Sequence, residues 1–412
     1  MIAYERTTLA NGLTVAVNRD RASKLAAVNI LYKVGARNEN PARTGFAHLF
    51  EHLMFRGTRE VPNFDLPVQM ASGDNNAFTN NDYTDFYITL PKDNLETALW
   101  LESDRMEGLE ITPEKLAAEK KVVIEEFRQR YLNQPYGDQT MLLRALAYKV
   151  HPYRWAAIGL TTEHIASASP DDVGEFYRTH YYPSNAILSI SADMEEERML
   201  ELAEKWFGGL PDTPRPAAPI PQEPPQEAPR REEVERDVPA TTVTVAYRMG
   251  TRTSPDFYTA DLVSDLLSGG DSGRLYRHLV KERRLLSSVN AYVTGDLDPG
   301  LFVFTGQLLP GVAPEAAEAA FREEIEALRT APISQYETEK VKNKFEANTL
   351  FGELNVMNKA MNLGFYEMLG DLPLINGEVA RYRAVSDEDI RAFCRSTLRP
   401  ENASTLIYKA RK

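Results

Sequence analysis

The segment His48-Leu49-Phe50-Glu51-His52 constrains this chain more than any other. In a helix, side chains four residues apart lie on one face, one turn apart, so His48 and His52 can hold one cation between them. Glu51 emerges beside that face and can reach a water molecule on the cation. The order His-x-x-Glu-His is the inverse of the commoner metalloprotease order His-Glu-x-x-His. A chance occurrence of this motif is improbable because the chain has only six histidines.

Composition narrows the remaining possibilities. A chain of 412 residues predicts two or three domains. The net charge of -13 disfavours nucleic acid as a partner, because a phosphate backbone requires basic patches. The one cysteine, Cys394, rules out an intrachain disulfide and a cysteine-based zinc site. No apolar run approaches the ~18 residues that span a bilayer. The segment Met1–Arg6 does not resemble a signal peptide, so we expect a cytoplasmic protein, or a periplasmic one if a signal was removed.

A proline-rich segment divides the chain into two similar halves. Eight of the 25 prolines lie between Pro211 and Pro229, which favours an extended, semi-rigid linker. Residues 28–37 match residues 243–252, and residues 176–186 match residues 393–403 at nearly the same offset. Two matches at a nearly constant offset favour a duplicated domain over coincidence. We predict an N-terminal domain over residues 1–210, a linker over 211–231 and a homologous C-terminal domain over 232–412.

Strand and helix patterns occur in blocks, which favours an α+β fold with a mainly antiparallel sheet packed with helices in each domain. In the first half we expect strands at 13–17, 27–34, 85–90 and 186–191, and helices at about 94–107 and 113–131. The helix with the histidine motif is expected to begin at the N-cap Thr44 and to stop at Gly57. The second half has Val263, Leu266 and Leu267 where the first has His48, Glu51 and His52, so only the first domain is expected to bind metal.

A catalytic zinc ion takes three protein ligands and leaves one position open. His48 and His52 supply two, and a carboxylate is the chemical expectation for the third. The segment 118–126 contains three candidates, with Glu119 and Glu126 seven residues apart on one helical face. Spacing alone does not choose among Glu119, Glu125 and Glu126.

These motifs and the duplication resemble the pitrilysin-type inverted-zincin (HxxEH) metallopeptidases, specifically the short two-domain type similar to mitochondrial processing peptidase subunits. The resemblance covers the whole chain and includes the Glu-Lys/Arg-x-x-Val-x-x-Glu helix that holds Glu119 and Glu126. It implies one Zn²⁺ per chain, with His48, His52 and Glu126 as ligands. It assigns Glu51 as the general base and Glu119 as a second catalytic-site carboxylate that supports the ligands. The implied activity is zinc-dependent endopeptidase cleavage of peptides or unfolded segments inside a closed chamber.

The resemblance also assigns substrate contact to Asn76-Ala77-Phe78-Thr79 as an edge strand beside the zinc. An unpaired strand edge recognises the main chain of an extended peptide, so specificity is expected to be broad. An ordinary polar turn that leads into a strand is the alternative interpretation of the same residues.

One departure from the family pattern bears on partners. Relatives that bind peptide through the second half carry an Arg and a Tyr shortly after a segment like 269–276, and this chain has Val280 and Ser287 there. We therefore expect a homologous partner subunit that lacks zinc but carries the Arg/Tyr pair, with a homodimer as the second choice. A non-catalytic scaffold subunit and a zinc hydrolase of non-peptide substrates are the alternative functions. The other histidines are expected to be structural or exposed: His151, His164, His180 and His278.

Overall fold

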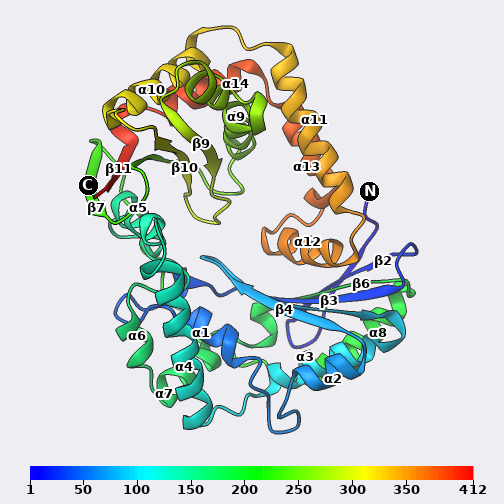
Figure 1. Ribbon diagram of the computed structural model, residues 1–412. Coiled ribbons are helices and arrows are strands. Elements are labelled where there is room, and N and C mark those ends of the chain that lie inside the picture. The colour runs from blue at the N-terminus through cyan, green and yellow to red at the C-terminus, as the bar shows by residue number, and fades with distance from the viewer. Residues whose placement is uncertain (217, 412) are drawn as a thin grey trace. The chain divides into compact units, whose positions relative to one another are not determined.

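The computed structural model describes residues 1–216 and 218–411. The chain forms two compact units (Figure 1). Unit 1 contains Met1–Arg128, Trp155–Ile220 and Leu350–Gly377, and unit 2 contains Gln129–Arg154, Pro221–Thr349 and the residues from Glu378 onwards. Among the described residues, no helix combines the length and the apolar character that a membrane crossing requires.

Unit 1 is built on a six-stranded sheet with the strand order β1-β2-β6-β3-β5-β4. Strands β2 and β6 pair in parallel, and the other neighbours are antiparallel. The strands are β1 (Glu5–Thr8), β2 (Thr14–Arg19), β3 (Leu25–Tyr32), β4 (Asp74–Thr79), β5 (Thr84–Pro91) and β6 (Ala186–Ala192). Strand β4 therefore lies at one edge of the sheet, which is the edge nearest the histidine motif.

Helices cover both faces of this sheet. In Figure 1, α12 lies on one side of the unit 1 strands, and α1 and α3 lie on the other. Strand β3 is consequently buried on both faces apart from Leu25, which explains its nearly continuous apolar sequence. The helices of unit 1 are α1 (Phe46–Leu53), α2 (Asp65–Met70), α3 (Leu95–Glu107), α4 (Pro113–Phe127), α6 (Thr162–Ala166), α7 (Pro170–His180), α8 (Glu196–Phe207) and α12 (Val356–Met368).

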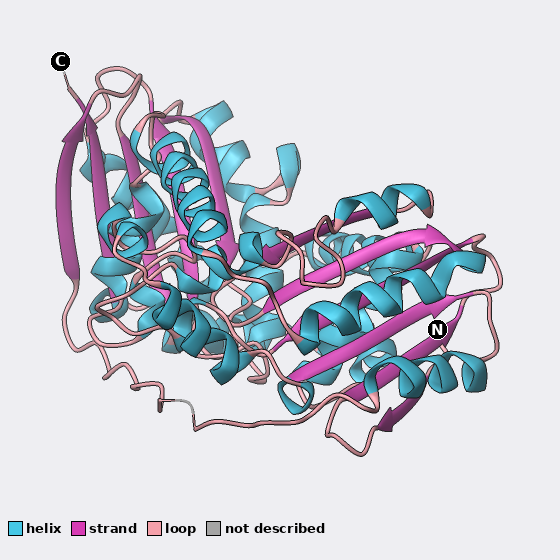
Figure 2. Cartoon of the chain, turned by 90° about the horizontal axis from the view of Figure 1, so that it is seen from below, coloured by secondary structure: helices cyan, strands magenta, loops and turns pink. Residues whose placement is uncertain are grey.

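Unit 2 repeats the arrangement with a five-stranded sheet in the order β7-β11-β8-β10-β9. Its strands are β7 (Arg230–Arg236), β8 (Thr242–Arg248), β9 (Leu286–Val293), β10 (Leu301–Leu308) and β11 (Ala403–Ala410). Its helices are α5 (Gln139–Ala147), α9 (Phe257–Ser268), α10 (Pro314–Thr330), α11 (Gln335–Gly352, as far as Thr349), the second part of α13 (Leu374–Ala384) and α14 (Asp387–Ser396). Figure 2 separates these helices from the strands by colour.

The two sheets confirm the α+β prediction and the internal duplication. Strands β2, β6, β3, β5 and β4 have the same order in unit 1 as β7, β11, β8, β10 and β9 have in unit 2. In both sheets the first pair of that series is parallel. The predicted fold class of two similar sheet-and-helix domains is therefore what the chain adopts.

Each unit takes one helix from the other half of the sequence. Helix α5 packs on β8 and β11 of unit 2, and α12 packs on β3 and β6 of unit 1. Helix α12 begins at Val356, 217 positions after α5 begins at Gln139, so the two helices are equivalent elements of the repeat. The predicted domain boundaries divide the sequence into consecutive segments, 1–210, 211–231 and 232–412. Each compact unit instead contains residues from both halves of the sequence.

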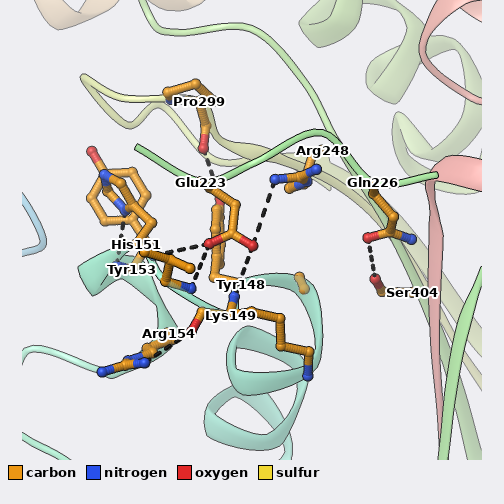
Figure 3. Close-up of polar contacts among 12 residues, drawn as sticks. Tyr148, Lys149, His151, Tyr153, Arg154, Glu223, Gln226, Arg248, Pro299 and Ser404 are labelled. Atoms are coloured by element: carbon orange, nitrogen blue, oxygen red, sulfur yellow. Dashed lines mark hydrogen bonds and ion pairs between the residues drawn. The ribbon is translucent and has the colours of Figure 1, made fainter. Parts of the chain in front are cut away.

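The linker is anchored on unit 2 at its C-terminal end (Figure 3). The Glu223 carboxylate accepts backbone N–H bonds from Lys149, Val150 and His151 at 2.7–2.9 Å. Burial raises the pKa of Glu223, but these hydrogen bonds and the positive charge of Arg248 outweigh it and hold the pKa below its usual range. Between residues 211 and 229, the described part of the chain has neither helix nor strand (Figure 2), whereas the last two residues of the predicted linker, 230 and 231, begin strand β7.

Candidate metal centre

Helix α1 presents the histidine motif from a buried platform. Its apolar residues Phe46, Leu49, Phe50 and Leu53 are all buried, and the Phe50 ring stacks on Tyr181 with centroids 4.8 Å apart. Because these residues anchor one side of the helix, His48 and His52 share a different side. Their ring centroids lie 4.8 Å apart.

The start of α1 differs from the prediction. Gly45, not Thr44, is the N-cap, and it has the left-handed φ of 89° that favours glycine. A Cβ at Gly45 would lie 2.5 Å from the carbonyl oxygen of Ile158, so a larger residue does not fit. The Thr44 hydroxyl instead accepts the backbone N–H of Leu160 at 2.7 Å. The Thr44 N-cap prediction is wrong because a tertiary contact competes for that hydroxyl.

Glu39 is a site-supporting residue that the sequence reasoning missed. Its carboxylate accepts the N–H groups of Gly45 and Ala47, both at 2.9 Å, and so satisfies two donors at the positive end of α1. Burial raises the pKa of Glu39 to about 8, although these hydrogen bonds oppose the shift. Glycine at position 45 has no side chain that could cap the helix, so the sequence indicates that another residue must do so. It does not indicate that this residue is Glu39.

Helix α4 supplies the carboxylates. It begins at Pro113 after the N-cap Thr112, whose hydroxyl accepts the N–H of Lys115 at 3.2 Å. The helix packs against α1. Glu119 is 2% exposed and Glu126 is half-buried, and both are in contact with His52. Glu125 points elsewhere: its side chain is 57% exposed and pairs with Arg128.

The structure brings His48, His52 and Glu126 together, with potential ligand atoms all within 4.8 Å of one another. Nε2 of His52 lies 3.3 Å from Oε2 of Glu126, and Nε2 of His48 lies 3.7 Å from Oε1 of the same carboxylate. Ligands at zinc–ligand distances of about 2.0–2.2 Å in a tetrahedron lie roughly 3.3–3.6 Å apart. Two imidazoles and one carboxylate are also a known donor set for catalytic zinc. The three residues therefore fit a zinc ion with one open position.

Glu119 orients His52 through the ring nitrogen that does not face Glu126. Its Oε2 lies 3.3 Å from Nδ1 of His52, which leaves Nε2 directed at Glu126. Arg56, which the sequence reasoning did not single out, pairs with the other Glu119 oxygen. Burial lowers the pKa of His52, but the hydrogen bonds and negative charges of Glu119 and Glu126 outweigh it and raise the pKa to about 9. The position of the His52 imidazole between these carboxylates therefore favours positive charge.

Glu51 and the predicted substrate strand also meet. Oε2 of Glu51 accepts the hydroxyl hydrogen of Thr79 at 2.7 Å. Thr79 is the last residue of β4, and Asn76, Ala77 and Phe78 precede it in the same strand. Strand β4 pairs with β5 on one side, and no described strand pairs with its other edge. The segment is thus an edge strand, and the alternative of a simple polar turn is wrong.

Comparison with known proteins agrees with this arrangement. The sequence profile described as Insulinase (Peptidase family M16) matches residues 14–155, and the one described as Peptidase M16 inactive domain matches residues 167–345. The chain belongs to peptidase family M16. The M16 profiles together cover both halves, and the family resemblance drawn from the sequence is confirmed.

Two relatives come from Helicobacter pylori. The "Zinc protease PqqE" is 32% identical over 345 residues, which cover 82% of this chain and 78% of that protein. The crystal structure of "a protease from Helicobacter pylori" has a TM-score of 0.94 at 28% identity, covering 99% of this chain and all of that one. The "Probable mitochondrial-processing peptidase subunit beta" of Arabidopsis thaliana is 24% identical, covering 72% of this chain and 58% of that protein. The names of these relatives thus refer to proteolysis, and one of them also refers to zinc.

Among the described residues, the second half of the chain has no histidine-containing group that corresponds to this centre. Val263, Leu266 and Leu267 lie on α9, at most 2% exposed, and form part of the apolar core of unit 2. Val280 also packs against that core, and Ser287 is exposed with its hydroxyl near Gln307. Val280 is therefore an apolar packing residue, and Ser287 presents a small hydroxyl group at the surface.

The remaining histidines lie outside the metal centre and make local contacts. Nδ1 of His164 lies 2.8 Å from the Thr44 hydroxyl, and Nδ1 of His278 lies 2.7 Å from Glu324. His151 packs against Tyr153 and lies 3.2 Å from Asp298. Burial lowers the pKa of His180 to about 4, which keeps that imidazole neutral. These contacts agree with the expectation of structural or partly exposed roles.

Proposed function

We propose that this M16 chain is a zinc-dependent endopeptidase whose centre is His48, His52 and Glu126, with Glu51 as the general base. The observation that carries the proposal is the convergence of three ligand atoms from α1 and α4 within 4.8 Å. A supporting observation is the contact between Glu51 and Thr79, which places the base beside a strand edge that no described strand covers.

A bound zinc ion supplies a Lewis acid that makes water more acidic and stabilises negative charge on a carbonyl oxygen. Glu51 then accepts the proton that water loses as it attacks the scissile carbonyl, and returns the proton to the leaving amine. Thr79 donates to one oxygen of Glu51, which fixes the orientation of the carboxylate. Glu119 and Arg56 hold His52 in the orientation that the centre requires.

The substrate that fits this site is an extended or unfolded peptide. A peptide can pair with the free edge of β4 through main-chain hydrogen bonds, which are largely independent of side-chain identity. This geometry brings the peptide backbone next to Thr79 and therefore next to Glu51. A zinc hydrolase of small non-peptide substrates would have no use for a free strand edge at this position.

Removal of the metal tests the proposal. Treatment with a chelator is expected to abolish cleavage of a quenched fluorescent peptide, and one equivalent of zinc is expected to restore it, because the three side chains provide one catalytic site. Metal content and cleavage rate are measured on the same samples. A purified protein that binds one zinc ion but cleaves none of a panel of unfolded peptides, alone or with a partner, would instead favour the non-catalytic scaffold function.

We further propose that a homologous subunit completes the substrate site. Val280 and Ser287 offer no charged group and no phenol to a bound peptide, and M16 relatives named as a "subunit" of mitochondrial-processing peptidase support assembly with a second chain. Addition of a homologous subunit that carries the Arg/Tyr pair is expected to raise kcat/KM about tenfold or more, since hydrogen bonds to charged groups contribute roughly 1.5–3 kcal/mol each. The control is the same subunit with Val and Ser at those positions. Full activity of the isolated chain as a monomer or homodimer would contradict this proposal.

A further inference from the structure

Unit 1 contains a second pocket, on the sheet face opposite α1. It has a volume of about 250 Å³ and lies between the sheet and α12. Its lining residues come from β3, the β4–β5 turn, β5 and α12: Leu31, Tyr83, Asp85, Met361, Asn362 and Phe365. None of these residues belongs to the metal centre.

The floor of this pocket carries a buried carboxyl group. Asp85 is only 2% exposed, and the fully buried side chain of Asn29 lies beside it and acts on the carboxyl as a hydrogen-bond donor. The Oδ1 atom of Asp85 has no hydrogen bond of standard geometry among the described residues, and neither has the hydroxyl of the neighbouring, fully buried Ser189. A ligand that carries hydrogen-bond donors would complete the pairing of this oxygen.

The walls of the pocket suit a cation. Tyr83 and Phe365 place two aromatic rings beside the carboxyl, with centroids 6.2 Å apart and planes inclined at 52°. Ring faces attract ammonium and guanidinium groups, and the methylene chain of a lysine or arginine packs well on Met361 and Leu31. Burial raises the pKa of Asp85 well above its usual range. A cation beside the carboxyl would lower that pKa again and restore the charge.

The pocket is adjacent to the proposed substrate strand. Asp85 pairs in register with Phe78 of β4 on one side and with Leu31 of β3 on the other, so these three side chains share the α12 face. Phe78 also packs against Tyr83, with ring centroids 5.7 Å apart. A peptide strand added to β4 would lie two strand spacings, or about 9.6 Å, from β5. A long basic side chain on the α12 face can span that distance together with the Asp85 side chain.

We propose that this pocket binds the lysine or arginine side chain of a peptide that lies along β4, and so selects substrates with a basic residue. The inference rests on the proposed function for the location of the peptide, but the pocket's chemistry is independent of zinc. Asp85 would pair with the cationic head, and Tyr83 and Phe365 would enclose it. Main-chain pairing with β4 would supply affinity, and this pocket would supply sequence preference.

The test compares two peptides that differ in one side chain. Lysine and the isosteric, uncharged norleucine are placed at each position in turn of an otherwise uncharged fluorescent peptide, and Kd is measured on the Glu51→Gln protein. At one position the lysine peptide is expected to bind about tenfold more tightly than the norleucine peptide, which corresponds to about 1.4 kcal/mol, because the aromatic rings and the carboxyl attract the cation. Asp85→Asn keeps the shape of the pocket and should remove this preference without weakening norleucine binding.

Two further variants make the result specific. Phe365→Leu should reduce the lysine preference because it removes one aromatic wall. Asp93→Asn removes the same charge from an exposed position of unit 1 and should leave the preference unchanged. Thermal unfolding of Asp85→Asn is measured in parallel, so that a lost preference in a folded protein is distinguished from a loss of folding.

The outcomes separate this inference from the proposed function. Equal binding of lysine and norleucine peptides at every position, or a preference that survives Asp85→Asn, would overturn the basic-residue pocket even if the protein is an active peptidase. Lysine-selective binding that depends on Asp85, in a protein without peptidase activity, would support the pocket while the endopeptidase proposal fails. A failure to bind either peptide would overturn the pocket's role and the role of the β4 edge together.

Discussion

Glu51→Gln is expected to lower kcat/KM for peptide cleavage by about 10²–10⁴-fold, the range that general acid–base catalysis contributes. Glutamine has almost the same shape and still accepts the hydroxyl hydrogen of Thr79, but it cannot take a proton from water. The ligand atoms of His48, His52 and Glu126 are unchanged, so the zinc content should stay at one ion per chain. The measurement is the cleavage rate of a quenched peptide at saturating zinc.

The control for Glu51→Gln separates the base from the metal. Loss of activity with full zinc content assigns Glu51 to proton transfer, whereas loss of both would make it a structural or ligand residue. Retention of near-complete activity would remove Glu51 from the role of base and leave the proposed mechanism without a proton acceptor. Peptide affinity should change little, because β4 is unaltered in this variant.

Glu126→Ala is expected to weaken zinc binding by at least about a hundredfold, because even residues that only support a metal ligand typically account for 10–100-fold. The Glu126 carboxylate contacts both imidazoles, at 3.7 Å and 3.3 Å, so its removal also takes away the negative charge that balances the cation. Competition with a chromophoric chelator measures the zinc affinity directly. Peptide cleavage should fall in parallel at limiting zinc.

The neighbouring residue provides a matched control. Glu125→Ala removes the same side chain one position earlier, where it is exposed and pairs with Arg128, and should leave zinc affinity nearly unchanged. The opposite result, with Glu125→Ala losing zinc and Glu126→Ala keeping it, would show that the third ligand is misassigned. This pair of variants also tests the choice between Glu125 and Glu126, which helical spacing left open.

Local sequence patterns predicted much of unit 1. Expected strands at 27–34, 85–90 and 186–191 correspond to β3, β5 and β6, and no end is shifted by more than two residues. The helix expected from 113 to 131 is α4 as far as Phe127, followed by a π-helical turn to Leu132. These elements were predictable because hydrophobic periodicity and turn residues act over short distances along the chain.

Contacts between segments that are distant in the sequence could not be predicted from local patterns. Glu39 and Arg56 both support the centre, yet nothing near them in the sequence indicates which helix they contact. Thr44 has the chemistry of an N-cap but bonds to Leu160, more than a hundred residues away. Asp85 lies in a strand whose alternation predicts burial, and only the cover of α12 shows that the carboxyl lines a pocket.

The sequence by itself determined the ligand types, the spacing of His48 and His52 on one helical face, and the duplication of the domain, because each depends on residue identity at short or constant separations. Tertiary structure alone decided that Glu126 rather than Glu125 meets the histidines, and that α5 and α12 each pack on the sheet of the other half. The physical reason is that periodicity specifies an apolar face and a direction for each side chain, but not the partner that will cover them. That partner is chosen by packing among all elements together.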